Sequence, residues 1–491
     1  MNNSPQQTSG KMTNYRWTIC AMLFFATTVN YLDRQVLSLT FEEFIKPEFH
    51  WNDNHYGTIT AFFSLLYAVS MLFAGKFVDW MGSKKGFLWA IGVWSVGAVM
   101  HAGCGWFTLL WVDQPNAAAL IALEAGSAAA VIVATVSMYA FLVARAVLAI
   151  GEAGNFPAAI KVTAEYFPKK DRAFATSIFN AGATIGALLA PITIPTMAKY
   201  FQGIGVGNGW EMAFIIVGAT GFVWMGFWIF LYDKPANSKY VNAAELAYIE
   251  QDNEEEAKAA AATTVDEGKT MSFKDAFRYK QTWAFAVGKF MTDGVWWFFL
   301  FWTPSYIDSV FGIKASSGQG VVMITVLYAI TMLSIYGGKL PSIIMSKTGM
   351  DPYAARMRAM LIFAFFPLLA LMAQPLGGIS PWFPIIIIGI AGAAHQSWSA
   401  NIFSTVGDMF PKYSIATIVG IGGMAGGIGS FLINKGSGML FTHAEVTNMT
   451  FMGFEGKPAG YFIIFSVCAV AYLTGWIIMK TLVPKYKPIE A

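Results

Sequence analysis

The chain is poor in charged residues and in cysteine, and each shortage argues against a class of protein. Only 12% of the 491 residues are charged and 56% are hydrophobic, whereas roughly 25% charged is usual in soluble domains. A net charge of +3, with scattered Lys and Arg, does not suit a nucleic-acid partner. The 3 cysteines have no CxxC spacing, so no disulfide framework, metal site or cofactor is indicated. The composition is that of a membrane protein.

Long apolar segments recur along the whole chain. The first is too long, and lacks the small-residue cleavage site, to be a removable signal peptide, so we expect it to remain as a span. A spanning helix needs about 20 apolar residues. By that measure we predict an all-α membrane protein with about twelve transmembrane helices. They are centred near Phe25, Leu66, Trp94, Tyr139, Gly186, Phe222, Trp297, Leu327, Phe365, Ile388, Ala425 and Val470.

A long polar stretch divides these segments six and six. We predict an N-terminal six-helix bundle over residues 1–232, a cytoplasmic linker over 233–280 and a C-terminal six-helix bundle over 281–491. The linker contains Asn242 and Glu245 at the spacing of a capping box. The stretch near 107–130 is apolar but broken by acidic residues and proline, and we expect an external insertion there.

Basic residues gather in alternate loops, which predicts the orientation in the membrane. Lys and Arg concentrate on the cytoplasmic side of membrane proteins. Both termini are therefore expected in the cytoplasm, and the nearly uncharged or acidic alternate loops outside. The clusters are Lys11 and Arg16; Lys84 and Lys85; Lys161, Lys169, Lys170 and Arg172; Lys274, Arg278 and Lys280; Lys347, Arg356 and Arg358; and Lys480, Lys485 and Lys487.

Ionisable residues also occur inside the apolar runs. A charge at the bilayer centre costs roughly 2.5 to 3.5 kcal/mol on insertion scales, so a charge retained there usually faces an aqueous pathway for an ion or a substrate. These residues indicate transport. They are Asp33 and Arg34, Arg145 and Glu152, and Lys289 and Asp293.

One loop resembles the signature loop of the major facilitator superfamily. The segment GKFVDWMGSKKG lies between the second and third predicted spans, with a degenerate counterpart, GGKLPSIIMSKTG, in the second half. Trp80 stands where a basic residue is usual. The resemblance implies two six-helix bundles and a loop that gates conformational change through Gly75, Asp79, Gly82, Lys84 and Lys85.

Further motifs resemble the anion:cation symporter family, and within it the hexuronate transporters. They are NYLDR at 30–34, Tyr67 twelve residues before Asp79, RAVLAIGEAGNFPAAIKVTAEYFPKKDRAFATSIFNAG at 145–182, TDGVWWFFLFWTPSYI at 292–307 and AAHQSWSANIFSTVGDMFPKYSIATIVGIGGMAGGIG at 393–429. The resemblance implies import of galacturonate or glucuronate with protons or sodium. It also implies that Tyr31 and Tyr67 lie at the substrate.

The chemistry of an organic anion identifies two candidate arginines. A carboxylate entering a cavity of low dielectric needs a cation, and the planar guanidinium of Arg34 or Arg145 can bind it through two parallel hydrogen bonds. Arg145 and Glu152 are seven residues apart and project from nearly the same helix face. If the arginine moves onto substrate, buried Glu152 can hold a proton. Asp33 is a second candidate proton site. Alternatively, these charges only hold two helices together.

Polar and aromatic side chains in the second half suit the sugar end of such an anion. The motif HQSWSAN supplies His395, Gln396, Ser399 and Asn401 beside Trp398, for which stacking, packing and a lipid-facing position are all open. Alternatively, some of these groups only bond neighbouring helices. In the seventh span, Lys289 is a second candidate cation and Trp297 a candidate contact. Lys289 can instead pair with Asp293 at i,i+4.

The sequence thus predicts a multi-pass transporter of the bacterial inner membrane, functional as a monomer, that imports a hexuronate by proton symport. The partners expected are a small organic anion, protons and the lipid bilayer. Carriage of an aldonate such as galactonate, or of an aromatic acid, is the alternative within the same fold. Sodium coupling stays open. A membrane-bound enzyme is not favoured, because no catalytic triad, metal-ligand cluster or soluble catalytic domain is present. A channel is a further alternative, and saturable uptake that is accelerated by counterflow would exclude it.

Overall fold

The computed structural model describes residues 11–251 and 271–489, and most of them are helical. In this part of the chain, 9 helical segments are long and apolar enough to cross a membrane. Three further helices of 25, 32 and 28 residues carry the polar side chains described below, which lower their mean hydropathy. These three are α1 (Arg16–Thr40), α13 (Lys280–Phe311) and α19 (Trp382–Met409). The expected all-helical architecture is confirmed.

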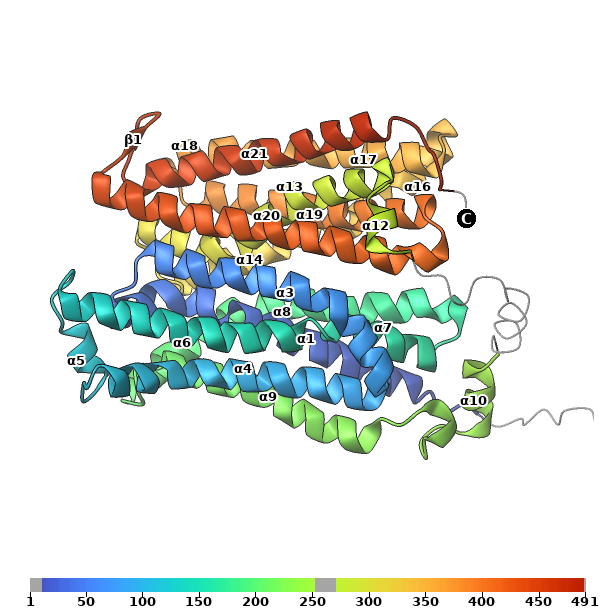
Figure 1. The fold of residues 1–491 in the computed structure, drawn as a ribbon, viewed down its shortest axis with the longest axis horizontal. Coiled ribbons are helices and arrows are strands. Elements are labelled where there is room, and N and C mark those ends of the chain that lie inside the picture. Colours follow the sequence, from blue (N-terminus) through green and yellow to red (C-terminus); the bar gives the residue numbers. More distant parts are fainter. Residues whose placement is uncertain (1–10, 252–270, 490–491) are drawn as a thin grey trace, which may run out of the picture.

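The long helices run side by side in two stacked halves (Figure 1). The first half contains α1, α3 (Asp53–Met81), α4 (Ser83–Trp111), α6 (Ala128–Glu152), α7 (Asn155–Tyr166), α8 (Lys169–Gly203) and α9 (Trp210–Leu231). The second contains α13, α14 (Gly318–Thr331), α15 (Ser334–Gly337), α16 (Leu340–Thr348), α17 (Pro352–Phe365), α19, α20 (Lys412–Thr447) and α21 (Lys457–Leu482). Each predicted span centre falls in one of these helices or in the short helix that continues it.

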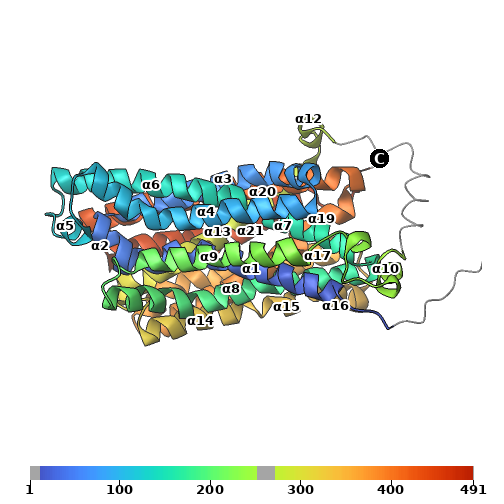
Figure 2. The same ribbon diagram turned by 90° about the horizontal axis from the view of Figure 1, so that it is seen from below.

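Short elements mark the two ends of the bundle. At one end lie α10 (Ala243–Ile249), α12 (Phe273–Ala276) and the C-terminus; we call it the linker end (Figures 1 and 2). At the other, the hairpin end, lie α5 (Ala117–Ile121) and a two-stranded hairpin of β1 (Thr450–Phe451) and β2 (Phe454–Glu455). The remaining elements are η1 (Phe41–Ile45), α2 (Lys46–Phe49), η2 (Pro235–Asn237), η3 (Phe366–Met372) and α18 (Ala373–Gly377).

Glycines allow the helices to pack closely. A Cβ atom at Gly182 would lie 2.4 Å from the carbonyl oxygen of Phe24, and one at Gly186 would lie 2.5 Å from that of Thr28, so α8 touches the backbone of α1. In the second half, a Cβ at Gly429 would lie 2.1 Å from the carbonyl oxygen of Phe290. Small residues commonly permit such contacts between membrane helices. The glycine-rich runs therefore position α1 and α13, which carry the central charges.

The linker docks onto the start of α1 through one carboxylate. Glu245 accepts hydrogen bonds from the backbone N–H groups of Tyr15 and Arg16 at 2.8 and 3.0 Å, and pairs with the Arg16 guanidinium at 3.0 Å. Asn242 caps α10 as expected by accepting from the Glu245 N–H at 2.9 Å. The reciprocal bond of a capping box is not formed, because Arg16, Tyr15 and Thr13 occupy the Glu245 carboxylate. Residues 252–270 of the predicted linker lie outside the described part.

Candidate substrate cavity

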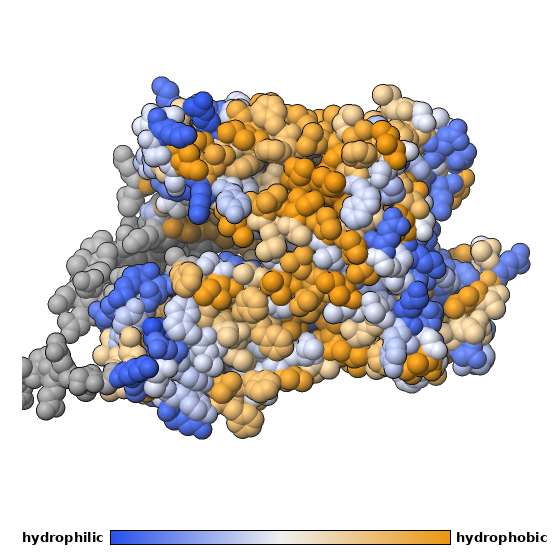
Figure 3. Space-filling view, turned by 180° about the vertical axis from the view of Figure 1, so that it is seen from behind, coloured by the Kyte–Doolittle hydropathy of each residue, from blue (hydrophilic) through white to orange (hydrophobic). Residues whose placement is uncertain are grey.

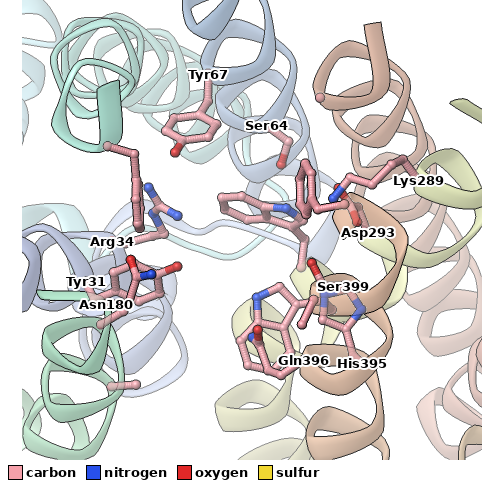
Figure 4. Close-up of a pocket in the computed structure, with 18 of the residues that line it drawn as sticks. Tyr31, Arg34, Ser64, Tyr67, Asn180, Lys289, Asp293, His395, Gln396 and Ser399 are labelled. Carbon is pink, nitrogen blue, oxygen red and sulfur yellow. The ribbon is translucent and has the colours of Figure 1, made fainter. Parts of the chain in front are cut away.

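A cavity of about 520 Å³ lies between the two halves. This volume is within the usual range for small-molecule sites, about 300 to 1,000 Å³. Figure 3 shows a hollow between the halves at the linker end, and Figure 4 shows the polar side chains that face one another across the cavity. The polar and aromatic lining residues are Tyr31, Arg34, Ser64, Tyr67, Phe156, Asn180, Thr184, Lys289, Asp293, Trp296, Trp297, Tyr328, Thr331, Ser334, His395, Gln396, Ser399 and Phe403.

Arg34 is the cation on the wall formed by the first half. Its Nε and Nη2 atoms both donate to Oε2 of Glu152, at 3.0 and 2.7 Å. The guanidinium carbon lies 5.0 Å from the ring centre of Tyr31, 4.8 Å from that of Tyr67 and 4.9 Å from that of Trp297. Aromatic faces attract a cation and fix its position. The expected residues Tyr31, Arg34, Tyr67 and Trp297 therefore come together at one place.

Two further charged residues of the first half lie behind Arg34. Arg145, on α6, donates from Nη2 to the carbonyl oxygen of Arg34 at 3.2 Å and packs over Phe63 at 4.9 Å. Asp33 is 1% exposed, and neither of its carboxylate oxygens has a hydrogen-bond partner in the described structure. Glu152 likewise has one oxygen without a partner. We expected Arg145 and Glu152 to face the cavity, but neither lines it here, because Arg34 occupies the position in front of them.

The second half presents a cation and a carboxylate together. Lys289 and Asp293 both line the cavity, and their charged atoms are 2.7 Å apart, so the alternative of an i,i+4 pair is realised. The ammonium group also lies 4.4 Å from the ring centre of Phe403. Figure 4 shows this pair on the opposite side of the cavity from Arg34. The sequence analysis names Asp293 among the ionisable residues that indicate transport but does not include it among the substrate contacts, and the structure places it on the cavity wall.

The HQSWSAN motif contributes three polar lining residues and Ala400. His395, Gln396 and Ser399 line the cavity from α19. His395 stacks on Trp296 with ring centres 5.4 Å apart, and its Nδ1 lies 2.7 Å from the hydroxyl of Tyr472. Asn401 does not line the cavity as expected, since it faces its own helix and donates to the carbonyl oxygen of Ser397 at 2.8 Å.

The sequence analysis did not identify every residue that lines the cavity. Of the roles left open for Trp398, the structure shows packing and not a lipid-facing position: the side chain is fully buried and packs edge-on against Tyr472, with ring centres 5.6 Å apart. Asn180 of α8, Ser64 of α3 and Tyr328 of α14 line the cavity without having been singled out. Asn180 stands next to the small-residue run of its span, so its position as an isolated amide in an apolar segment was the available signal.

The signature loop lies at the linker end, between α3 and α4. Asp79 pairs with Lys161 of α7 at 2.8 Å, and Lys84 pairs with Asp233 beyond α9 at 2.8 Å. Gly82 has φ of 77°, a backbone conformation that favours glycine, and it separates the two helices. Gly75 has open space around it, and Lys85 and Trp80 are exposed. One ion pair therefore links α3 to α7, and the other links α4 to the end of α9. Both lie within the first half.

At the hairpin end, the two halves are held together by polar contacts. Lys457 of α21 lies 2.8 Å from a carboxylate oxygen of Asp53 and 3.4 Å from one of Glu42. The Tyr56 hydroxyl donates to the carbonyl oxygen of Phe301 at 2.7 Å. Lys435 donates to the Asn54 amide oxygen at 2.7 Å. Since the hollow is at the linker end and these contacts are at the hairpin end, the described structure is open at one end and closed at the other.

Comparisons with known proteins agree with this geometry. Residues 23–434 match the family model of the Major Facilitator Superfamily. The chain is 27% identical to the hexuronate transporter of Escherichia coli (strain K12), over 98% of this chain and 96% of that one. It is 27% identical to the galacturonate transporter of Dickeya chrysanthemi, over 67% of this chain and 83% of that one. These names support the coarser expectation, a transporter of organic anions.

Solved structures show the same fold. A bacterial homologue of the human lysosomal transporter Spinster, in an inward-facing and occupied conformation, matches with a TM-score of 0.68 at 17% identity, over 98% of this chain and 100% of that chain. The match of residues 23–434 to the family model confirms the superfamily predicted from the signature loop. The chain belongs to the major facilitator superfamily and is a multi-pass membrane transporter, not an enzyme.

Proposed function

We propose that this protein imports a hexuronate, such as glucuronate or galacturonate, together with protons by alternating access. The observation that carries the proposal is the position of Arg34, a cation on the cavity wall with a buried carboxylate, Glu152, directly behind it. A guest carboxylate can form two parallel hydrogen bonds with a guanidinium. Arg34 is thus the binding site for the carboxylate of the sugar acid, and the relatives named above supply the substrate class.

The rest of the cavity suits the sugar end of a uronate. A sugar ring has an apolar face and several hydroxyl groups, which call for an aromatic surface beside polar side chains. Trp297 and Tyr67 lie next to Arg34 and provide the aromatic surface. Gln396, Ser399 and Asn180 provide amide and hydroxyl groups from two different halves. A guest bound this way contacts both halves at once.

Protonation of Glu152 couples the proton to the sugar acid. While Glu152 is ionised, it occupies the Arg34 guanidinium; once protonated, it releases Arg34 to the guest carboxylate. Arg145 stays behind and stabilises the negative charge that remains on Asp33. One proton carried with one monoanion moves no net charge, whereas a second proton on Asp33 makes uptake respond to the membrane potential, by about 2.3 kcal/mol per charge per 100 mV.

The closed hairpin end and the open linker end correspond to the two gates of an alternating-access cycle. We assign the linker end to the cytoplasm of a bacterial inner membrane, because the basic loops gather there. Both described chain ends lie on that side (Figure 2). The cavity is built within one chain, which supports function as a monomer. The division at 1–232, 233–280 and 281–491 then separates two rocking bodies and their linker.

Uptake of labelled glucuronate by proteoliposomes tests the proposal. An inward pH gradient drives concentrative uptake in wild type, and galacturonate competes more strongly than gluconate or benzoate. Arg34→Ala abolishes binding, and Arg145→Ala does the same because it removes the support behind Arg34. Glu152→Gln stops proton-driven accumulation but retains exchange of labelled for unlabelled substrate. Glu455→Gln, at an exposed site of the hairpin, is the matched control.

Three results would overturn parts of the proposal. Normal concentrative uptake by Glu152→Gln would reject the proton site. Uptake that follows a sodium gradient and ignores the pH gradient would replace protons by sodium. Preferential uptake of gluconate or benzoate over both uronates would replace the substrate class by an aldonate or an aromatic acid.

A further inference from the structure

The two cations of the cavity are neutralised in different ways. On the first half, Arg34 lines the cavity, whereas its partner Glu152 is fully buried behind it and does not line the cavity. On the second half, Lys289 and its partner Asp293 line the cavity side by side. A guest therefore meets a cation on one wall and, on the other, a cation beside a half-buried carboxylate (Figure 4).

The Lys289 and Asp293 pair cannot be separated by a rocking motion. Both residues belong to α13 at i,i+4, so they stay together in any rigid movement of the second half. Phe403 packs against the ammonium group at 4.4 Å. A Cβ atom at Gly426 would lie 2.2 Å from Oδ2 of Asp293, so the backbone of α20 lies directly against the carboxylate. The negative charge of Asp293 is thus fixed at the cavity wall.

We infer that Asp293 determines how many carboxylates the substrate carries: it restricts this transporter to acids with one carboxylate and a hydroxyl-bearing far end. The inference rests on the proposed function, since it takes Arg34 as the site of the first carboxylate. A hydroxyl group suits the Lys289 and Asp293 pair because it accepts a hydrogen bond from the ammonium and donates one to the carboxylate. A second carboxylate can only accept, and it meets Asp293 as a like charge.

A pair of open-chain acids isolates this property. Gluconate and glucarate have the same six-carbon chain, and they differ only in whether the far end is a hydroxymethyl group or a second carboxylate. Each is titrated as a competitor of labelled glucuronate uptake in proteoliposomes. The ratio of their inhibition constants does not depend on how much active protein each preparation contains. In wild type, we expect glucarate to inhibit about tenfold more weakly than gluconate.

Removal of the carboxylate reverses the preference. Asp293→Asn and Asp293→Ser each leave Lys289 as a free cation, and glucarate then inhibits as strongly as gluconate or more so. The double variant Lys289→Met with Asp293→Asn loses this gain, because no second cation remains. Asp275→Asn removes the same charge at an exposed site of α12, where Asp275 pairs with Arg278 at 3.4 Å, and keeps the wild-type ratio.

Each outcome decides the inference. If either Asp293 variant no longer transports glucuronate, the same ratio is measured on purified protein from the rise in melting temperature that each acid produces. An unchanged ratio in both Asp293 variants overturns the inference, and so does a gain for glucarate that persists in the double variant. Failure of wild type to take up glucuronate at all would instead reject the proposed function, which separates the two failures.

Discussion

Arg34 and Glu152 meet at a single carboxylate oxygen. Both Arg34 hydrogen bonds end on Oε2, at 3.0 and 2.7 Å, while Oε1 of Glu152 has no partner in the described structure. Breaking such a buried pair leaves an uncompensated charge, which is strongly unfavourable. A guest anion avoids this cost if a proton neutralises Glu152 as the guest takes Arg34. The two binding events are then thermodynamically linked. Bound substrate raises the affinity of Glu152 for a proton, and a bound proton raises the affinity for substrate by the same factor.

This geometry predicts that Arg34 cannot be replaced by lysine. Arg34→Lys keeps the charge but loses the planar fork that holds two hydrogen bonds at once. We expect Arg34→Lys to lower kcat/KM for glucuronate uptake by about 100-fold. Arg34→Ala should lower it at least as much. Initial rates over a range of substrate concentrations in proteoliposomes measure the effect. Retention of wild-type kcat/KM in Arg34→Lys would show that a point charge is sufficient.

The sequence was most informative where the membrane itself constrains it. Runs of about 20 apolar residues have few alternatives to a spanning helix, so every predicted span centre lies in a long helix or its continuation. The NYLDR motif placed Arg34 at the cavity because a charge in such a run needs an aqueous neighbour. Helical periodicity also related Arg145 to Glu152. It could not say that a third residue, Arg34, stands between them and the cavity.

Contacts between distant parts of the chain were beyond the sequence reasoning. Asp53 and Lys457 are separated by most of the chain, and nothing in their local sequence indicates the other. Asn401 and Trp398 show the same limit within one helix, since their motif predicts a polar cluster but not which members face the neighbouring helix. Glu245 was assigned to a capping box from spacing alone, whereas tertiary contacts with Arg16 claim its carboxylate.

A close contact between the halves predicts a steric effect at Gly438. A Cβ atom there would lie 2.5 Å from the carbonyl oxygen of Asp53 and 3.0 Å from the Cα of Gly57. Gly438→Ala should therefore force α3 and α20 apart at the hairpin end and lower the uptake rate by about tenfold, since overpacking typically costs 1 to 3 kcal/mol. Gly436→Ala, with open space around the added methyl, is the control. Equal rates for the two variants would contradict the closed contact.

The docking of the linker predicts a pH-dependent contribution to stability. Burial of Glu245 favours its neutral form, but hydrogen bonds from Thr13, Arg16 and Tyr15 outweigh it and hold the Glu245 pKa below its usual value. Its stabilisation is therefore complete at neutral pH and is lost as the pH falls through the folded-state pKa. Glu245→Gln should cost about 2 kcal/mol at neutral pH.

Thermal unfolding of the purified protein measures that difference. The melting temperatures of wild type and Glu245→Gln should converge as the medium becomes strongly acidic, because wild type then also carries a neutral side chain. Glu250→Gln, at an exposed position after α10, should match wild type throughout. A gap between wild type and Glu245→Gln that is the same at all pH values would show that the charge of Glu245 is not what holds the linker.

The ion pair between Asp53 and Lys457 predicts which end of the cavity opens when it is lost. Asp53 is fully buried, and its carboxylate lies 2.8 Å from the Lys457 ammonium, so Asp53→Asn leaves that cation with Glu42 alone, at 3.4 Å. Removing one partner of a buried pair typically costs 2 to 5 kcal/mol, and here only the state closed at the hairpin end bears that cost. A cysteine at Ser64, on the cavity wall, should therefore react faster with a membrane-impermeant maleimide applied from the hairpin side. With Glu455→Gln in place of Asp53→Asn, the rate should stay at the wild-type value. No acceleration in Asp53→Asn would mean that the other contacts at this end keep it closed without the ion pair.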